Sequence, residues 1–206
     1  PGTVKTAGRW FRRDDSFFYP VTINLRSPYD ALVATALKPT PQPPANAGTQ
    51  ALAPWIERCA TNGINWIRLW TMPDSLGLEW SAAWQGYHGR NRYNLANASR
   101  LDHLFNVARA HHVTLELALW QHGPWQREVD PQWDDNPWNI ANGGHLTNPE
   151  DLLTDPQLRT AHRNLLRYMA ARWGADPALA AWTLWIEVDG ATNRGVADWH
   201  QEMTTE

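Results

Sequence analysis

The sequence has a single cysteine and no long apolar run, and both absences exclude classes of protein. Cys59 stands alone, so neither a disulfide framework nor a zinc site built on several cysteines can form within one chain. No stretch approaches the roughly 20 consecutive apolar residues of a transmembrane helix, so we expect no membrane partner. The formal net charge is −3 and Arg and Lys form no run, which argues against a nucleic-acid partner.

Motifs that bind metals or phosphates are also missing from the sequence. There is no His-Glu-x-x-His motif and no His-x-His pair at a predicted strand end, so a metal site has weak support. No glycine-rich phosphate-binding turn follows the first predicted strand. We therefore expect no cofactor and no metal.

Tryptophan, by contrast, is abundant, with 14 residues in a chain of 206. Some of these side chains will lie in the core, but tryptophan is large and is seldom fully buried. A surplus in loops is better explained by flat apolar platforms, against which the C–H faces of sugar rings pack. The composition therefore favours a ligand that is a carbohydrate.

Four apolar runs predict strands, and helical periodicity follows each of them. The runs have the near-continuous hydrophobicity of strands buried on both faces of a parallel sheet. The predicted strands are 17–25, 64–70, 113–119 and 179–186. The predicted helices begin near Leu52, at a Ser99–Asp102 capping pair, at Asp155-Pro156 and at Arg194.

The lengths of the loops indicate how these units are arranged. Loops after strands are long and aromatic, whereas loops after helices are very short, as in a TIM barrel that builds its active site from its βα loops. A doubly wound sheet shares this bias but lacks support from a glycine-rich turn. We therefore predict an α/β fold, a (β/α)₈ TIM barrel of which about the first four units are present. Residues 1–16 are expected to be a lead-in segment, and 17–206 the N-terminal half of a glycosidase-type barrel, cut inside its fourth helix.

Glu187 is the strongest candidate for a catalytic residue. It ends the fourth predicted strand in the segment WTLWIEVD, at the position where catalytic groups project from a barrel. Its neighbours are apolar, among them Trp185 and Ile186, and are expected to desolvate the carboxylate, which favours the protonated form that a general acid needs. The alternative is a structural ion pair with an arginine at the mouth of the barrel.

Arg68 is a lone cation within the second apolar strand. Burying an unpaired guanidinium is very unfavourable, so Arg68 must have a carboxylate partner. Strand alternation places it on the same face as Trp66 and Trp70, pointing into the barrel near the mouth. A catalytic and a structural role are compatible. Glu116 lies deep within the third strand, about 13 Å below the mouth at ~3.3 Å per residue, and is expected to be structural.

Two further segments carry candidate binding residues. Trp120 and His122 end the third strand, although a lone histidine is more often a satisfied hydrogen-bond partner than a catalyst. The loop WDDNPWNIANGGH combines Trp133 and Trp138 with several amides and carboxylates, including Asn142, which suits a ligand covered in hydroxyls. The alternative is a stiff loop that forms hydrogen bonds with itself, which Asn, Gly and Pro also favour.

Several of these motifs resemble those of a known family. GINWIRLW resembles the second-strand motif of clan A glycoside hydrolases, and WTLWIEVD their fourth-strand motif. The series DNPWN, NGGH, LLRYMAARWG and WTLWIEVD resembles a bacterial cellulase- and β-mannanase-like subgroup, often preceded by a small β-sandwich. The resemblance runs from about Phe17 to the C-terminus.

The resemblance implies a retaining glycosidase that acts on a β-linked oligo- or polysaccharide. Glu187 matches the acid/base and Arg68 matches the arginine that orients the nucleophile. Trp120 and His122 match the third-strand end that lines the substrate site. Trp70 and Trp185 lie near the ends of predicted strands and are therefore also candidates for substrate binding. A secreted or periplasmic bacterial location is expected.

Two departures from the family pattern keep alternatives open. Ile186 stands where the family has asparagine, which normally binds the sugar 2-hydroxyl, so a catalytically inactive carbohydrate-binding relative is one alternative. The nucleophile is expected on a seventh strand, in a C-terminal half absent from this chain, and the open half-barrel edge is expected to self-associate. A metal-dependent barrel enzyme is a third hypothesis.

Overall fold

The computed structural model describes residues 2–26, 47–84 and 86–205. Its first strands are β1 (Val4–Ala7), β2 (Trp10–Arg13), β3 (Ser16–Phe18) and β4 (Thr22–Leu25). Then follow α2 (Ala47–Thr61), β5 (Trp66–Trp70), α3 (Leu95–Ala110), β6 (Thr114–Gln121), α4 (Pro156–Trp173), β7 (Leu179–Ile186) and α5 (Val196–Met203). Short 3₁₀ helices lie in the loops: η1 (Gly123–Trp125), η2 (Trp133–Asp135), η3 (Ile140–Asn142), η4 (Pro149–Leu153) and η5 (Val188–Gly190).

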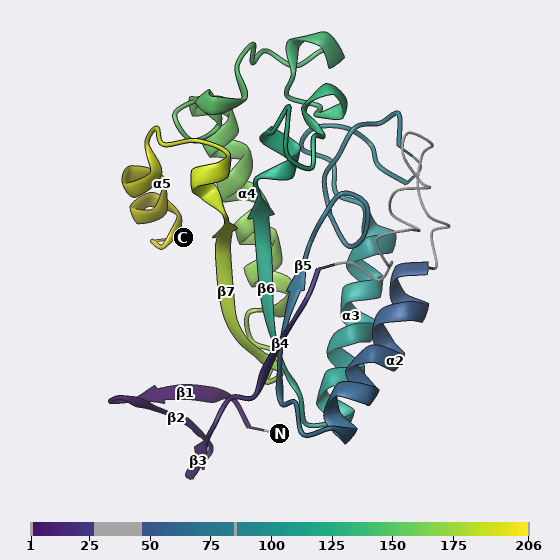
Figure 1. Cartoon of the computed structure of the whole chain (residues 1–206), viewed down its shortest axis with the longest axis vertical. Coiled ribbons are helices and arrows are strands. Elements are labelled where there is room, and N and C mark those ends of the chain that lie inside the picture. The colour runs from purple at the N-terminus through teal and green to yellow at the C-terminus, as the bar shows by residue number, and fades with distance from the viewer. Residues whose placement is uncertain (1, 27–46, 85, 206) are drawn as a thin grey trace.

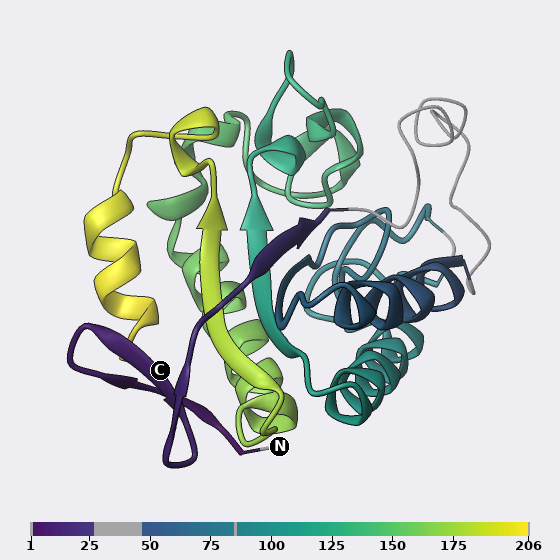
Figure 2. The same ribbon diagram turned by 60° about the horizontal axis from the view of Figure 1, so that its bottom comes forward.

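A parallel sheet in the order β4-β5-β6-β7 forms the centre of the molecule. Helices α2, α3 and α4 lie against its outer side, and the long loops gather above the carboxyl ends of the strands (Figures 1 and 2). The main core lies between sheet and helices, where Ile67, Leu69, Leu115 and Leu117 are fully buried. Sequential parallel strands with helical crossovers on one side confirm the predicted partial TIM-barrel-like fold.

The predicted first strand, 17–25, is wrong as a single element. Its beginning belongs to β3, and β4 begins only at Thr22. Between them lies Pro20, which lacks the N–H that a continuous ladder needs. Phe17 is 61% exposed and Phe18 is 7% exposed, because alternate side chains of an antiparallel strand face opposite sides.

Residues expected to form a lead-in are ordered as a second, antiparallel sheet in the order β1-β2-β3. Val4 and Phe18 pack on Trp66 at the beginning of β5, with Ala180 and Ala181 of β7 beside them. This small sheet therefore lies at the amino ends of the parallel strands, opposite the long loops (Figure 1).

The helices confirm one predicted cap and correct another. Asp155 caps α4 by accepting a hydrogen bond from the N–H of Leu158 at 2.8 Å, and Pro156 takes the first helical position, as predicted. The expected Ser99–Asp102 cap is wrong, because the N-cap of α3 is Asn94, five residues earlier. There the side chain of Asn94 accepts a hydrogen bond from the N–H of Asn97 at 3.0 Å.

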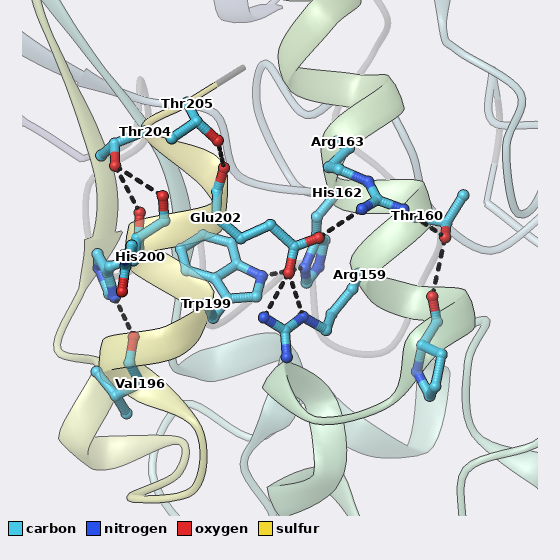
Figure 3. A network of polar contacts seen from close by, with 12 residues as sticks. Arg159, Thr160, His162, Arg163, Val196, Trp199, His200, Glu202, Thr204 and Thr205 are labelled. Carbon is cyan, nitrogen blue, oxygen red and sulfur yellow. Dashed lines mark hydrogen bonds and ion pairs between the residues drawn. The ribbon is translucent and has the colours of Figure 1, made fainter.

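Helix α5 is fixed to α4 by polar and aromatic contacts (Figure 3). Glu202 accepts hydrogen bonds from Arg159 Nε and Arg163 Nη1, each at 2.6 Å. Trp199 is fully buried and donates its indole N–H to Nδ1 of His162 at 3.1 Å. Within the described ranges, no helix combines the length and apolar character that a membrane span requires.

Candidate functional site

The inner side of the sheet carries a buried carboxylate, Glu116. Because Arg68 and Glu116 are register partners on β5 and β6, their side chains lie side by side. Glu116 accepts hydrogen bonds from Arg68 Nε at 2.7 Å and from the indole of Trp66 at 2.8 Å, and also from the hydroxyl of Thr183 on β7. Arg68 thus has the carboxylate partner that its place in an apolar strand demanded, and Glu116 is held as a structural residue.

The hydrogen bonds determine the charge state of Glu116. Burial raises the pKa of this carboxyl, but the donors on Thr183, Trp66 and Arg68 outweigh it and lower the pKa below its ordinary value. Glu116 is therefore anionic near neutral pH and balances the guanidinium of Arg68. The Arg68 side chain is still 41% exposed.

Glu187 and His122 meet at the carboxyl ends of β7 and β6. Nδ1 of His122 lies 2.8 Å from Oε2 of Glu187, although the two groups are not aligned as a hydrogen bond. The His122 side chain is 7% exposed, whereas that of Glu187 is 61% exposed. The expected desolvation of Glu187 by its apolar neighbours is therefore wrong for the residues that the structure describes.

The backbone explains why Glu187 points away from the strand. It has φ 55° and ψ 47°, a left-handed conformation that is uncommon for a residue with a Cβ atom. This turn ends β7 and breaks the alternation that would have carried residue 187 back toward the core. Such conformations concentrate at functional sites, because surrounding structure must maintain them against their cost.

Three residues that the sequence analysis missed lie near this pair. Asp130 forms an ion pair with Arg26, and its Oδ2 lies 3.9 Å from Nε2 of His122. Arg26 also lies over the ring of Trp70 at 5.6 Å, and the indole of Trp70 donates to Asn24 at 2.6 Å. Asn24 and Arg26 could have been identified from the sequence, because they are polar residues at the end of an apolar strand. Asp130 could not, because it lies within a loop and no pattern marks it.

The other predicted binding residues lie elsewhere. Trp120 and Trp185 are neighbours across β6 and β7, with ring centroids 6.5 Å apart, and both pack on Trp199 of α5. Trp120 also contacts His162 of α4 at 4.8 Å. These two tryptophans therefore pack against the outer helices and are not brought together with Glu187; their substrate role stays a prediction.

The loop between η2 and η3 is stiffened by its own hydrogen bonds. The amide of Asn142 donates to the backbone oxygens of Asp134 at 2.7 Å and Asn136 at 2.9 Å. Trp133 and Trp138 are buried, with exposed fractions of 2% and 5%. The loop therefore has the features of the stiff, self-hydrogen-bonded loop that was the alternative interpretation of its sequence. Contact of these residues with a substrate stays a prediction.

The pattern of polar groups sets what this site can do chemically. A carboxylate beside an imidazole, with an arginine–glutamate pair below, suits proton transfer to a ligand at the carboxyl ends of the strands. In the part of the chain that the structure describes, no three or more His, Cys, Asp or Glu side chains are grouped to hold a metal ion.

Comparison with known proteins places the fold. No family model and no curated protein matches the sequence. Solved structures do match: endo-1,4-β-mannanase from Rhizomucor miehei has a TM-score of 0.64 at 14% identity over 99% of this chain. β-1,4-D-mannanase from Cryptopygus antarcticus has a TM-score of 0.57 at 20% identity over 92%. GH5_18 from Streptomyces cattleya, in complex with GlcNAc, has a TM-score of 0.59 at 16% identity over 90%.

The chain spans between 41% and 57% of the length of these three structures. At such identities the likeness shows the fold alone. The chain has a partial TIM-barrel-like fold similar to that of clan A glycoside hydrolases, which confirms the resemblance stated from GINWIRLW and WTLWIEVD at the level of the fold.

Proposed function

We propose that this chain forms part of a glycoside hydrolase that cleaves a β-linked glycan with retention, with Glu187 as acid/base. The observation that carries the proposal is the 2.8 Å approach of His122 to Glu187 at the carboxyl ends of adjacent barrel strands. In this reaction Glu187 protonates the leaving oxygen and then deprotonates water. Its exposure leaves it accessible to both.

Arg68 is proposed to hold the nucleophile of the reaction. Glu116 neutralises and orients its guanidinium, and 41% of the Arg68 side chain remains exposed. Arg68 can therefore hold a second carboxylate, the nucleophile, which a retaining enzyme needs about 5–5.5 Å from the acid/base. That second carboxylate is proposed to come from outside these 206 residues.

A mannan is the substrate to test first, because two of the similar structures are mannanases. The experiment is reducing-sugar release from mannan, cellulose and xylan by the whole protein, with and without a chelator. The proposal expects release from at least one polymer and no effect of the chelator. Loss of activity in the chelator would favour the metal-dependent alternative.

A specific observation favours a second candidate, a carbohydrate-binding relative without catalysis. Ile186 packs on the apolar cluster of Trp70, Met72 and Ala118 at the position where the family has asparagine. The contact to the sugar 2-hydroxyl that asparagine provides is therefore missing. Saturable binding of a mannan or cellulose oligosaccharide without any hydrolysis would establish this candidate.

We also propose self-association and a location outside the cytoplasm. Among the described strands, β4 and β7 each have one neighbour in the parallel sheet, so each offers an unpaired edge. Light scattering of the isolated 206-residue chain should show oligomers, and a monomer would contradict this. A polysaccharide does not cross a membrane, which supports a secreted or periplasmic location that cell fractionation can test.

A further inference from the structure

A cavity lies beside β6, and neither His122 nor Glu187 is among its lining residues. It is enclosed by the outer side of β6, by α4 and by the loops that follow β5 and β6, which gather above the strands in Figure 1. Its volume is about 80 Å³. One water needs about 10–15 Å³, so the cavity has room for several waters or for one small molecule.

Two polar side chains in the wall of this cavity have atoms with no hydrogen-bond partner among the described residues. Gln121 is 5% exposed, and neither its amide oxygen nor its amide nitrogen forms a hydrogen bond with any residue that the structure describes. Trp80 is 4% exposed, and its indole N–H is unpartnered within the same described ranges. Buried polar groups are nearly always satisfied, so these three atoms call for a ligand that offers both acceptors and donors.

The rest of the wall sets the character of that ligand. Trp120, Trp125 and Trp138 supply aromatic surface. Among the described lining residues there is no Lys or Arg, and the nearby Arg90 lies over the ring of Trp138, 5.4 Å from its centroid, so the wall favours a neutral ligand. Glu79 lies at the wall, where its Oε2 accepts a hydrogen bond from the backbone N–H of Asn91 at 3.0 Å. Burial raises the pKa of this carboxyl to about 7, so it can donate as well as accept near neutral pH.

We propose that this cavity is a second ligand site, which binds a small neutral polyhydroxylated molecule, a monosaccharide or polyol, through Gln121 and Trp80. Hydroxyl groups satisfy both halves of the Gln121 amide and the indole N–H of Trp80, while the C–H face of the ligand packs on the tryptophans. Gln121 is the last residue of β6 and His122 follows it directly, so the site is adjacent to the proposed catalytic mouth but separate from it. The proposal does not rest on hydrolysis.

The test is an NMR titration of the ¹⁵N-labelled full chain with D-mannose, D-glucose and glycerol. The indole signal of Trp80 is assigned with Trp80→Phe. We expect a saturable shift of the Trp80 indole and of one Gln side-chain amide. Gln121→Leu should weaken the affinity about tenfold, as expected for loss of hydrogen bonds in a buried site. Gln157→Leu, an exposed glutamine on α4, should leave it unchanged.

A second variant keeps the test independent of folding. Ala161 lines the cavity from α4, so Ala161→Met fills the space without removing a polar group and should abolish the shift. His122→Ala, which changes a residue at the mouth, should leave the shift intact. No saturable shift with any of the three compounds, or a shift that persists in both Gln121→Leu and Ala161→Met, would show that the cavity holds only water and would overturn the proposal. The titration reads binding and not hydrolysis, so its result does not depend on whether the protein is catalytically active.

Discussion

Nδ1 of His122 lies 2.8 Å from Oε2 of Glu187, and this contact joins the carboxyl ends of two neighbouring parallel strands. The His122 side chain is nearly buried whereas that of Glu187 is exposed, so the ring is enclosed by its surroundings and the carboxylate reaches the solvent. The histidine therefore restricts where Glu187 can point. This relationship leads directly to the first prediction.

Replacing His122 should impair turnover more than substrate binding. We expect His122→Ala to lower kcat by about tenfold to a hundredfold, because general acid–base catalysis contributes ~10²–10⁴ and depends on position. KM should change little. His103→Ala, an exposed histidine on α3, is the control. A normal kcat in His122→Ala would show that the contact with Glu187 has no positioning role.

Glu116→Gln should destabilise the protein. The substitution keeps the shape of the side chain but removes the charge that balances Arg68, and a charged hydrogen bond is worth about 1.5–3 kcal/mol. We expect a fall of about 1–3 kcal/mol in the free energy of unfolding, measured with urea. Glu128→Gln, an exposed residue, should have almost no effect. Equal stabilities of the two variants would contradict the structural role of Glu116.

Two carboxyls should make stability depend on pH in opposite directions. The pKa of Glu79 is raised from 4.5 to about 7 by burial, so its contribution to stability is complete below pH 4.5 and is lost as pH rises through 7. The pKa of Glu116 is lowered, so its contribution is present above pH 4.5 and is lost on acidification. Urea unfolding from pH 4.5 to 8 should therefore show Glu79→Gln gaining stability relative to the unsubstituted chain as pH rises. A constant difference would contradict the assigned pKa of Glu79.

Trp120 should matter for stability more than for substrate binding. Its ring packs on His162, Trp185 and Trp199 between the sheet and the outer helices. We expect Trp120→Phe to lower the free energy of unfolding by roughly 1–3 kcal/mol, less than full truncation of a buried aromatic. KM for a glycan should stay nearly unchanged. An unchanged stability with a raised KM would contradict this expectation and support the predicted substrate role of Trp120.

The sequence predicts the parallel sheet well and the small sheet not at all. The runs at 64–70, 113–119 and 179–186 are long, apolar and separated by short helix-to-strand turns, so local pattern and tertiary burial agree. Strands β1 to β3 have three or four residues each and leave Trp10 and Phe17 61% exposed. Their pairing depends on contact with Trp66, which no local pattern reveals.

The positions of the candidate residues at or near strand ends were predictable, but their contacts were not. Glu187, Arg68 and His122 follow from their places on apolar strands. The partnership of Arg68 with Glu116 depends on the register between β5 and β6, which single-strand patterns do not specify. The exposure of Glu187 follows from its left-handed backbone, which a residue with a Cβ atom rarely adopts and which the sequence therefore did not indicate.

The most direct test of the account compares Glu187→Gln with Asp189→Asn, an exposed carboxylate two residues away, in the whole protein. We predict that Glu187→Gln lowers glycan hydrolysis at least about a hundredfold. An aryl glycoside with a good leaving group should lose much less in its first step, because that leaving group needs no proton. Asp189→Asn should keep near-normal activity on both substrates. Near-normal glycan hydrolysis by Glu187→Gln would remove Glu187 from the acid/base role and contradict the account.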